Sequence, residues 1–98
     1  MSLLLILRPD AEADIQQAYR WYNKAAPRLG AAFMLRLENT LLNIQQDPSL
    51  YPIHFRDARR ALLRQFPYAV YYIVRFDLIE IVACIHLRRR PSQWRSRL

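Results

Sequence analysis

The sequence predicts an α+β domain in which a helical hairpin packs on one face of a four-stranded, mainly antiparallel sheet. Two long segments carry apolar residues at helical spacing, and four shorter segments have the apolar, alternating or β-branched composition of strands. Their order is β-α-α-β-β-β, with no internal repeat and no low-complexity linker. Residues 1–98 are therefore expected to form a single domain, because the hairpin and the sheet bury their apolar faces against each other.

The first strand and the first helix adjoin at Pro9. Ser2–Leu7 is a short apolar run with the composition of a strand covered on both faces. Pro9 fits the first position of a helix, and acidic residues in the first turns favour its positive N-terminal end. The helical apolar stripe consists of Ala11, Ile15, Ala18 and Tyr22. The first helix is expected to end at about Ala25.

The second helix is predicted to follow the segment APRLG, residues 26–30. Pro27 resists continuation of the first helix, and Gly30 is the only glycine of the chain. The stripe of the second helix consists of Phe33, Leu37, Leu41 and Ile44. Asp47-Pro48 ends this helix at about Gln46, since a residue before proline disfavours helical dihedral angles. The short break predicts an antiparallel pair of helices.

Three strands follow an ordered loop predicted over residues 49–57. They are predicted over residues 59–65, 68–75 and 78–88, and their short connections, Phe66-Pro67 and Phe76-Asp77, predict a meander. On the last strand, alternation predicts that one apolar face packs under the helices: Ile79, Ile81, Ala83, Ile85 and Leu87. The opposite, open face is predicted to carry Glu80, Val82, Cys84, His86 and Arg88.

The net charge of +7 lies entirely in the second half of the chain. Residues 1–53 carry five basic and five acidic residues, whereas residues 54–98 carry ten arginines against three acidic residues. Fourteen of the fifteen basic residues are arginine, whose planar guanidinium suits bidentate contact with phosphate or carboxylate. The second half is therefore expected to bind a polyanion, either nucleic acid or an acidic protein segment.

The composition argues against several classes of site and compartment. One glycine is too few for a phosphate-binding loop or a dinucleotide fingerprint, and two histidines with one cysteine give no metal-binding cluster. No cofactor and no metal are therefore expected. Cys84 has no partner for an internal disulfide, and the apolar run Leu3–Leu7 is too short for a signal peptide or a membrane span. The cytoplasm is the expected compartment.

A basic surface is expected where His86 and Arg88 lie on the open face. Arg60 and Arg64, or else Arg59, of the neighbouring strand would join them. RNA cleavage on this surface would need a proton-transfer group, which arginine does not supply because it keeps its proton. The candidates for such a reaction are His86, Arg64, Arg88 and Tyr72, with Tyr71 as the alternative tyrosine. A purely structural role for His86 stays open.

Five ordered segments resemble the RelE/ParE superfamily, the toxins of bacterial type II toxin–antitoxin pairs, also described as plasmid stabilisation proteins. The segments are PDAEADI, WYNKAAPRLGAAF, DPSLYP, RRALLRQFPYAVYY and HLRRRPSQWRSR, and together they extend from Pro9 to Arg97. The resemblance implies the β-α-α-β-β-β fold of that superfamily.

The resemblance implies one of two activities. ParE-like members inhibit DNA gyrase by protein–protein contact, and RelE-like members cut messenger RNA on the ribosome. The ending H-x-R-R-x-P-x-x-W-x-x-R resembles the ParE-like side, and the lysine and late tyrosine of RelE-like nucleases have no counterpart, since Lys24 is the only lysine and no tyrosine follows Tyr72. A non-enzymatic, growth-arresting gyrase inhibitor is therefore favoured, with a ribosome-dependent endoribonuclease as the alternative.

The resemblance also implies a cognate antitoxin whose flexible, acidic C-terminal segment wraps the toxin. The residues expected to bind the target or the antitoxin are Arg59, Arg60, Arg64, His86, Arg88, Arg89, Trp94 and Arg97. Trp94 would pack the tail onto the domain, anchor a partner or stack on a base. A homodimer and a toxin–antitoxin hetero-oligomer both stay open as assembly states.

Overall fold

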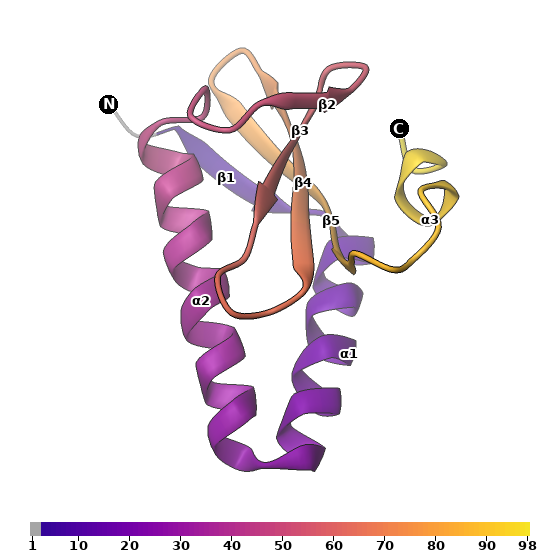
Figure 1. Cartoon of the computed structure of the whole chain (residues 1–98). Coiled ribbons are helices and arrows are strands. Elements are labelled where there is room, and N and C mark those ends of the chain that lie inside the picture. Colours follow the sequence, from indigo (N-terminus) through magenta and orange to yellow (C-terminus); the bar gives the residue numbers. More distant parts are fainter. Residues whose placement is uncertain (1–2) are drawn as a thin grey trace.

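The computed structural model describes residues 3–98 as a mixed sheet with two long helices on one face (Figure 1). Within these residues the sheet has five strands in the order β1-β5-β4-β3-β2. The strands are β1 (Leu4–Leu7), β2 (Ile53–Phe55), β3 (Ala58–Leu62), β4 (Tyr68–Arg75) and β5 (Leu78–His86). β1 is parallel to β5, and all other neighbours are antiparallel. The predicted fold class is confirmed, with one strand more than expected.

The additional strand is β2, which lies inside the predicted loop over residues 49–57. Ile53 pairs with Arg59 of β3. β2 is only three residues long and mostly exposed, so it carries no periodic signal. The connection from β3 to β4 is also longer than predicted, because β3 ends at Leu62 and the turn contains Gln65 at a φ of 69°.

The two long helices are α1 (Pro9–Ala25) and α2 (Pro27–Gln46), which confirms their outer boundaries. The predicted break over residues 26–30 is wrong from Pro27 onward. Only Ala26 is extended, and Pro27 occupies the first turn of α2, where its missing N–H has no helical partner to lose. Gly30 lies within α2 at the contact between the helices, where an added Cβ would lie 2.9 Å from the Cβ of Asn23. Glycine therefore permits close helix packing here rather than ending a helix.

β1 is an edge strand that is covered on one face only. Leu5 and Leu7 pack against the core, whereas Leu4 is 66% and Ile6 42% exposed. The prediction of a strand covered on both faces is therefore wrong, because the helices cover only one face of the sheet. Ser2 of the predicted strand lies outside the described residues.

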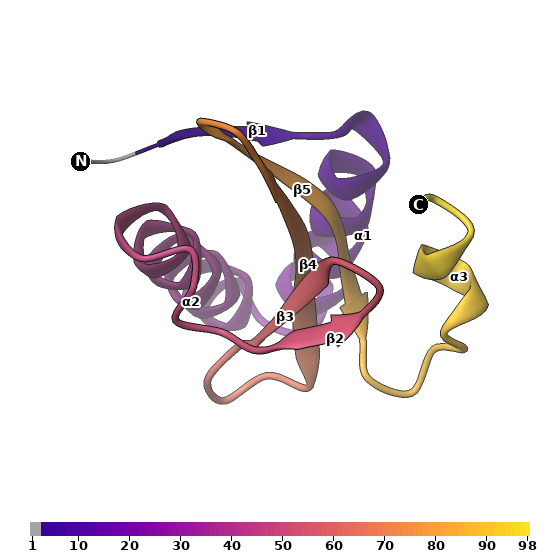
Figure 2. The ribbon, with the colours of Figure 1, turned by 90° about the horizontal axis from the view of Figure 1, so that it is seen from above.

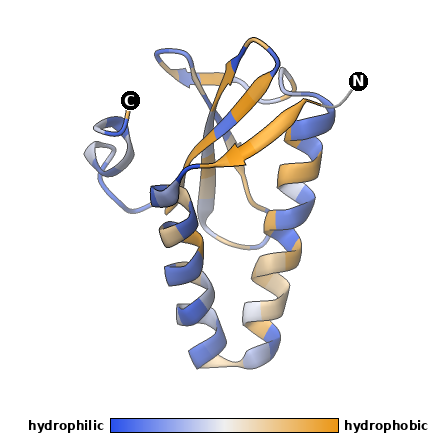
Figure 3. Cartoon of the chain, turned by 180° about the vertical axis from the view of Figure 1, so that it is seen from behind, coloured by the Kyte–Doolittle hydropathy of each residue, from blue (hydrophilic) through white to orange (hydrophobic). Residues whose placement is uncertain are grey.

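The main core lies between the helices and the sheet. Ala11, Ile15 and Ala18 of α1 and Phe33, Leu37 and Ile44 of α2 supply its helical side, as their spacing predicts. The colouring in Figure 3 shows predominantly apolar strands and helices that carry hydrophilic residues among apolar ones.

A β-bulge between β4 and β5 inverts the predicted faces of the last strand. Tyr71 pairs with Ala83 and Tyr72 with Ile81, so Val82 is the extra residue of β5. Side chains alternate with a period of two, and one inserted residue moves the following ones to the other face. Ile79 and Ile81 lie under the helices as predicted. The prediction is wrong for Ala83 and Ile85, which lie on the opposite face, and for Cys84 and His86, which lie on the helix side.

The face predicted to be open carries a second apolar cluster beneath the C-terminal segment. The buried members of this cluster are Ala58, Ala69, Tyr71, Ile73, Val82, Ala83, Ile85 and Trp94. Trp94 belongs to α3 (Ser92–Arg95), and Figure 2 shows α3 and α2 on opposite sides of β4 and β5. The sheet is therefore buried on both faces in this region.

Candidate interaction site

The C-terminal tail, residues 87–98, is attached to the domain at two points. The first is Trp94, which is 2% exposed and stacks on Tyr71 with a centroid distance of 3.9 Å and an interplanar angle of 13°. Phe55 meets the Trp94 ring edge-on at 5.8 Å. Trp94 therefore takes the first of its three expected roles, packing the tail onto the sheet.

The second attachment point is Arg97, which forms a bidentate pair with Asp14 of α1. Nη1 lies 2.6 Å from Oδ2 and Nη2 lies 3.1 Å from Oδ1, and Nη1 also donates to the carbonyl oxygen of Val82 at 3.1 Å. These hydrogen bonds to Asp14 raise the pKa of Arg97. Arg8 donates to the carbonyl oxygen of Arg97 at 2.9 Å. Arg97 is thus engaged inside the domain, and a partner would have to displace Asp14 to reach it.

The arginine loop, Arg88–Arg90, lies between the end of β5 and the Trp94 attachment point and is exposed. Within residues 3–98, no acidic side chain lies within ion-pair distance of its three guanidinium groups. Glu80 is already paired with Arg8 and Arg75, each at 3.0 Å. The base of the loop is fixed by backbone hydrogen bonds to His86, from Arg89 N–H to its carbonyl oxygen and from Arg88 N–H to its Nδ1, both at 3.0 Å. The loop therefore exposes three guanidinium groups without an acidic partner within residues 3–98, while its backbone is held by His86.

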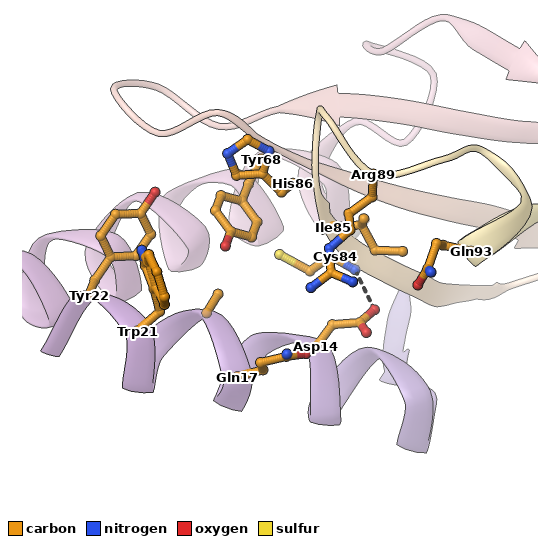
Figure 4. Close-up of a pocket in the computed structure, with 11 residues that line it drawn as sticks. Asp14, Gln17, Trp21, Tyr22, Tyr68, Cys84, Ile85, His86, Arg89 and Gln93 are labelled. Atoms are coloured by element: carbon orange, nitrogen blue, oxygen red, sulfur yellow. Dashed lines mark hydrogen bonds between the residues drawn. The ribbon is translucent and has the colours of Figure 1, made fainter. Parts of the chain in front are cut away.

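His86 lines a cavity of about 290 Å³ between α1, the ends of β4 and β5, and the tail. We call it the α1–β5 pocket (Figure 4). Its lining residues are Asp14, Gln17, Ala18, Trp21, Tyr22, Tyr68, Cys84, Ile85, His86, Arg89 and Gln93. Figure 4 shows the aromatic side chains toward one end of the pocket and Arg89 with Gln93 toward the other. The bulge creates this arrangement, because it turns His86 and Cys84 toward α1.

The aromatic end of the pocket has a fixed geometry. Tyr68 meets His86 edge-on at 5.2 Å and Tyr22 at 6.0 Å. Because His86 Nδ1 accepts the Arg88 N–H, the neutral imidazole carries its hydrogen on Nε2. Burial raises the pKa of both Tyr22 and Tyr68, so their hydroxyl groups are neutral at physiological pH.

Cys84 and Asp14 are the pocket residues with the least freedom to react. Burial, with a contribution from Asp14, raises the pKa of Cys84 to about 12, so its thiol is protonated and inert at physiological pH. Asp14 Oδ2 accepts the Cys84 N–H at 3.1 Å in addition to its two bonds from Arg97. The carboxylate of Asp14 is therefore satisfied within the domain.

The other arginines expected at the site lie elsewhere. Arg59 and Arg60 are opposite Tyr72 and Tyr71 of β4 and so lie on different faces of the sheet. Arg59 donates to the carbonyl oxygen of Tyr51 at 2.6 Å. Arg64 lines a separate hollow of about 400 Å³ beside α2. The three arginines therefore do not share one face of the sheet, and Arg64 lies at a different hollow from Arg89.

The four candidates for RNA cleavage are not brought together. Tyr72 is fully buried, donates its hydroxyl hydrogen to the carbonyl oxygen of Pro48 at 2.7 Å, and has a pKa raised by burial to about 12. Arg64 lies beside α2, while His86 lines the α1–β5 pocket. Arg88 is linked to His86 only through its backbone N–H.

The positions of Trp21 and His54 were not predicted from the sequence. Trp21 is 72% exposed at the α1–β5 pocket, and its only sequence signal is a large aromatic residue outside the apolar stripe of the first helix. His54 lies 6.1 Å from Trp94, ring to ring, and burial together with Arg60 and Arg95 lowers its pKa. No sequence signal marked His54, because it lies in the three-residue strand β2.

The described part of the chain, residues 3–98, contains neither a metal-binding cluster nor a membrane-spanning helix. No three histidine, cysteine or acidic side chains there come close enough together to hold a metal ion. No helix there combines the length and the apolar character needed to cross a membrane.

Comparison with known proteins relates this geometry to a family. A solved structure of the chromosomal ParDE TA system from P. aeruginosa superimposes with a TM-score of 0.76 over 87% of this chain and 96% of that chain. The two sequences are 18% identical, so the likeness establishes the fold. The comparison with curated protein sequences gave no significant match. The family model for the ParE toxin of the type II toxin–antitoxin system, parDE, matches residues 5–91, and the chain therefore belongs to the ParE toxin family.

Proposed function

We propose that this chain is the toxin of a type II toxin–antitoxin pair and that it inhibits DNA gyrase by protein–protein contact. Membership of the ParE toxin family is the observation that carries this proposal. The arginine loop supports a contact mechanism, because its cations are exposed and lack acidic neighbours within residues 3–98. The hydrogen bonds to His86 hold the tail before the arginine loop and the stacking of Trp94 on Tyr71 holds it after the loop, so the loop meets a partner with little loss of conformational freedom. Action on gyrase would take place in the cytoplasm.

A cognate antitoxin is the second partner in this proposal. The similar P. aeruginosa structure is of a ParDE system, which supports a paired protein for this chain as well. A flexible acidic segment would complement the second half of the chain, where the whole charge of +7 resides. Binding of such a segment across the arginine loop would block the surface that contacts gyrase.

Ribosome-dependent RNA cleavage is the second candidate function. One observation favours it, namely that His86 and Arg89 line the same pocket and so offer a proton-transfer group beside a cation. The burial of Tyr72 and the separate position of Arg64 weigh against it. Gyrase inhibition therefore remains the leading proposal.

The test is induction of the chain in a bacterial host without the antitoxin, with labelled thymidine and labelled amino acids followed over the first minutes. DNA synthesis is expected to fall first, and the purified chain is expected to inhibit supercoiling by gyrase. Arg88→Ala with Arg89→Ala should weaken that inhibition by about tenfold or more. The matched control is Arg20→Ala with Arg28→Ala, which removes two exposed arginines from the helices.

An early collapse of protein synthesis would contradict gyrase inhibition. If His86→Ala then abolished toxicity while the far-ultraviolet spectrum and the unfolding midpoint stayed unchanged, the chain would be a ribonuclease. Full inhibition of gyrase by the Arg88→Ala, Arg89→Ala variant would show that the arginine loop does not contribute to binding gyrase.

A further inference from the structure

We propose that the α1–β5 pocket receives one large apolar side chain of the antitoxin and that Arg89 binds a carboxylate beside it. This inference rests on the proposed function, which supplies the antitoxin. It adds which pocket of this chain the antitoxin occupies and which kinds of antitoxin side chain bind there.

The shape of the pocket suits a single side chain. Its volume of about 290 Å³ accommodates an aromatic or large aliphatic group. Trp21 contributes to the pocket and is 72% exposed, so a large apolar surface is left for a partner to cover. Tryptophan surfaces that become buried on binding are frequent energetic centres of protein interfaces.

The aromatic wall of the pocket is held in place by contacts within the domain. Tyr68 is in edge-on contact with both Tyr22 and His86, and the His86 ring is held by the backbone N–H of Arg88. An apolar side chain would therefore enter a preformed site without repacking its aromatic walls. A preformed pocket lowers the entropic cost of ordering a flexible segment.

The electrostatics of the pocket select an acidic neighbour for that side chain. Among the described residues that line the pocket, Asp14 is the only one with a carboxylate, and it is satisfied by Arg97 and by the Cys84 N–H. Arg89 is exposed and has no ion pair within residues 3–98. A carboxylate next to the apolar anchor would gain a charge-assisted hydrogen bond from Arg89, whereas a cation there would be repelled.

Continuity with the arginine loop favours a flexible antitoxin segment over a folded target surface. Leu87, which is 46% exposed, and Arg88–Arg90 extend the apolar and cationic character of the pocket along the tail. A flexible chain would insert one side chain into the pocket and place successive carboxylates along the loop. A folded surface would reach the pocket only through a protruding loop.

The experiment uses the complete chain and the complete protein encoded by the adjacent antitoxin gene, with the dissociation constant measured by biolayer interferometry. Trp21→Ala and Arg89→Glu should each weaken binding by about tenfold or more, while Arg89→Lys should retain most of the affinity. Tyr19→Ala, which removes another exposed aromatic residue of α1, and Arg56→Glu, which makes the same charge change in the turn between β2 and β3, are the matched controls. Both controls should bind within about twofold of the wild type.

Wild-type affinity in both Trp21→Ala and Arg89→Glu would overturn this inference while leaving the toxin–antitoxin pairing intact. If Trp21→Ala kept wild-type affinity for the antitoxin and instead lost gyrase inhibition or RNA binding, the pocket would belong to the target. Failure of the wild-type chain to bind the adjacent gene product would overturn the proposed function, and this inference with it. Because Trp21 and Arg89 are exposed, the variants should unfold at the wild-type denaturant midpoint, which the same preparations report.

Discussion

Arg97 and the arginine loop belong to the same basic tail, yet they occupy opposite environments. Arg97 is 18% exposed in its side chain and bridges Asp14 and the carbonyl oxygen of Val82, whereas Arg88–Arg90 are exposed and lack acidic partners within residues 3–98. The difference is the presence of a carboxylate within reach, since all four side chains have the same charge and belong to the same tail. A run of arginines therefore contains both structural and available cations, and only the three-dimensional neighbours separate them.

The largest effect on stability is expected at Trp94, which attaches the tail to the sheet. Trp94→Ala should lower the free energy of unfolding by about 3–5 kcal/mol, because it removes a buried indole and leaves a cavity over Tyr71. Urea denaturation followed by circular dichroism measures the change. Trp21→Ala is the matched control and should change stability by about 0.5 kcal/mol or less, since Trp21 is largely exposed. Equal losses of stability in the two variants would contradict the assignment of Trp94 as a structural residue and Trp21 as a surface residue.

Arg97→Ala should have the next largest effect. It leaves the Asp14 carboxylate, 14% exposed in its side chain, without its charged partner, which should lower the free energy of unfolding by about 2–4 kcal/mol. A double-mutant cycle with Asp14→Ala measures the coupling between the two residues. A coupling near zero would mean that the bidentate pair contributes no stability to the tail.

The arginine loop should contribute little to stability. Arg88→Ala, Arg89→Ala and Arg90→Ala should each change the free energy of unfolding by about 0.5 kcal/mol or less, because these side chains are exposed and form no ion pair within residues 3–98. The same denaturation curves are compared with that of Arg97→Ala. A loss as large as that of Arg97→Ala would show that the loop is structural as well.

The smallest expected effect is the contribution of His54 to the pH dependence of the free energy of unfolding. His54 lies beside the Trp94 attachment point. Burial, together with Arg60 and Arg95, lowers the pKa of His54, so the folded state binds this proton less readily than the unfolded state, where the pKa is close to 6.5. The His54 contribution is thus fully present above about pH 6.5 and is lost as the pH falls through the folded-state value. His54→Gln should make stability between pH 7 and pH 5 slightly less dependent on pH than in the wild type. Parallel curves for the two proteins would contradict this.

The arginine loop and the two attachment points, Trp94 and Arg97, also differ in how far the sequence predicted them. The exposure of the arginine loop follows from three consecutive arginines with few acids nearby. The packing of Trp94 was one of three roles that the sequence left open. The contact between Arg97 and Asp14 joins residues 83 positions apart and has no signature in either local segment.

The pocket depends even more strongly on tertiary structure. Its aromatic wall combines Trp21 and Tyr22 of α1 with Tyr68 of β4 and His86 of β5, and sequence alternation predicted that His86 would face the other way. Exposed Trp21 was not distinguished from any other residue on the solvent side of a helix. Both errors concern which elements lie next to each other, and a single sequence does not report that.

The sequence by itself determined the α+β class, the two long helices, the three longer antiparallel strands and the concentration of charge in the second half, because periodicity, proline positions and composition act over a few residues. Tertiary structure decided the rest. Pairing between β4 and β5 set the bulge at Val82, which inverted the end of β5 and turned His86 toward α1. The cause is the alternation of side chains along a strand: one extra residue exchanges the two faces, and its position is fixed by the partner strand and the packing on either side.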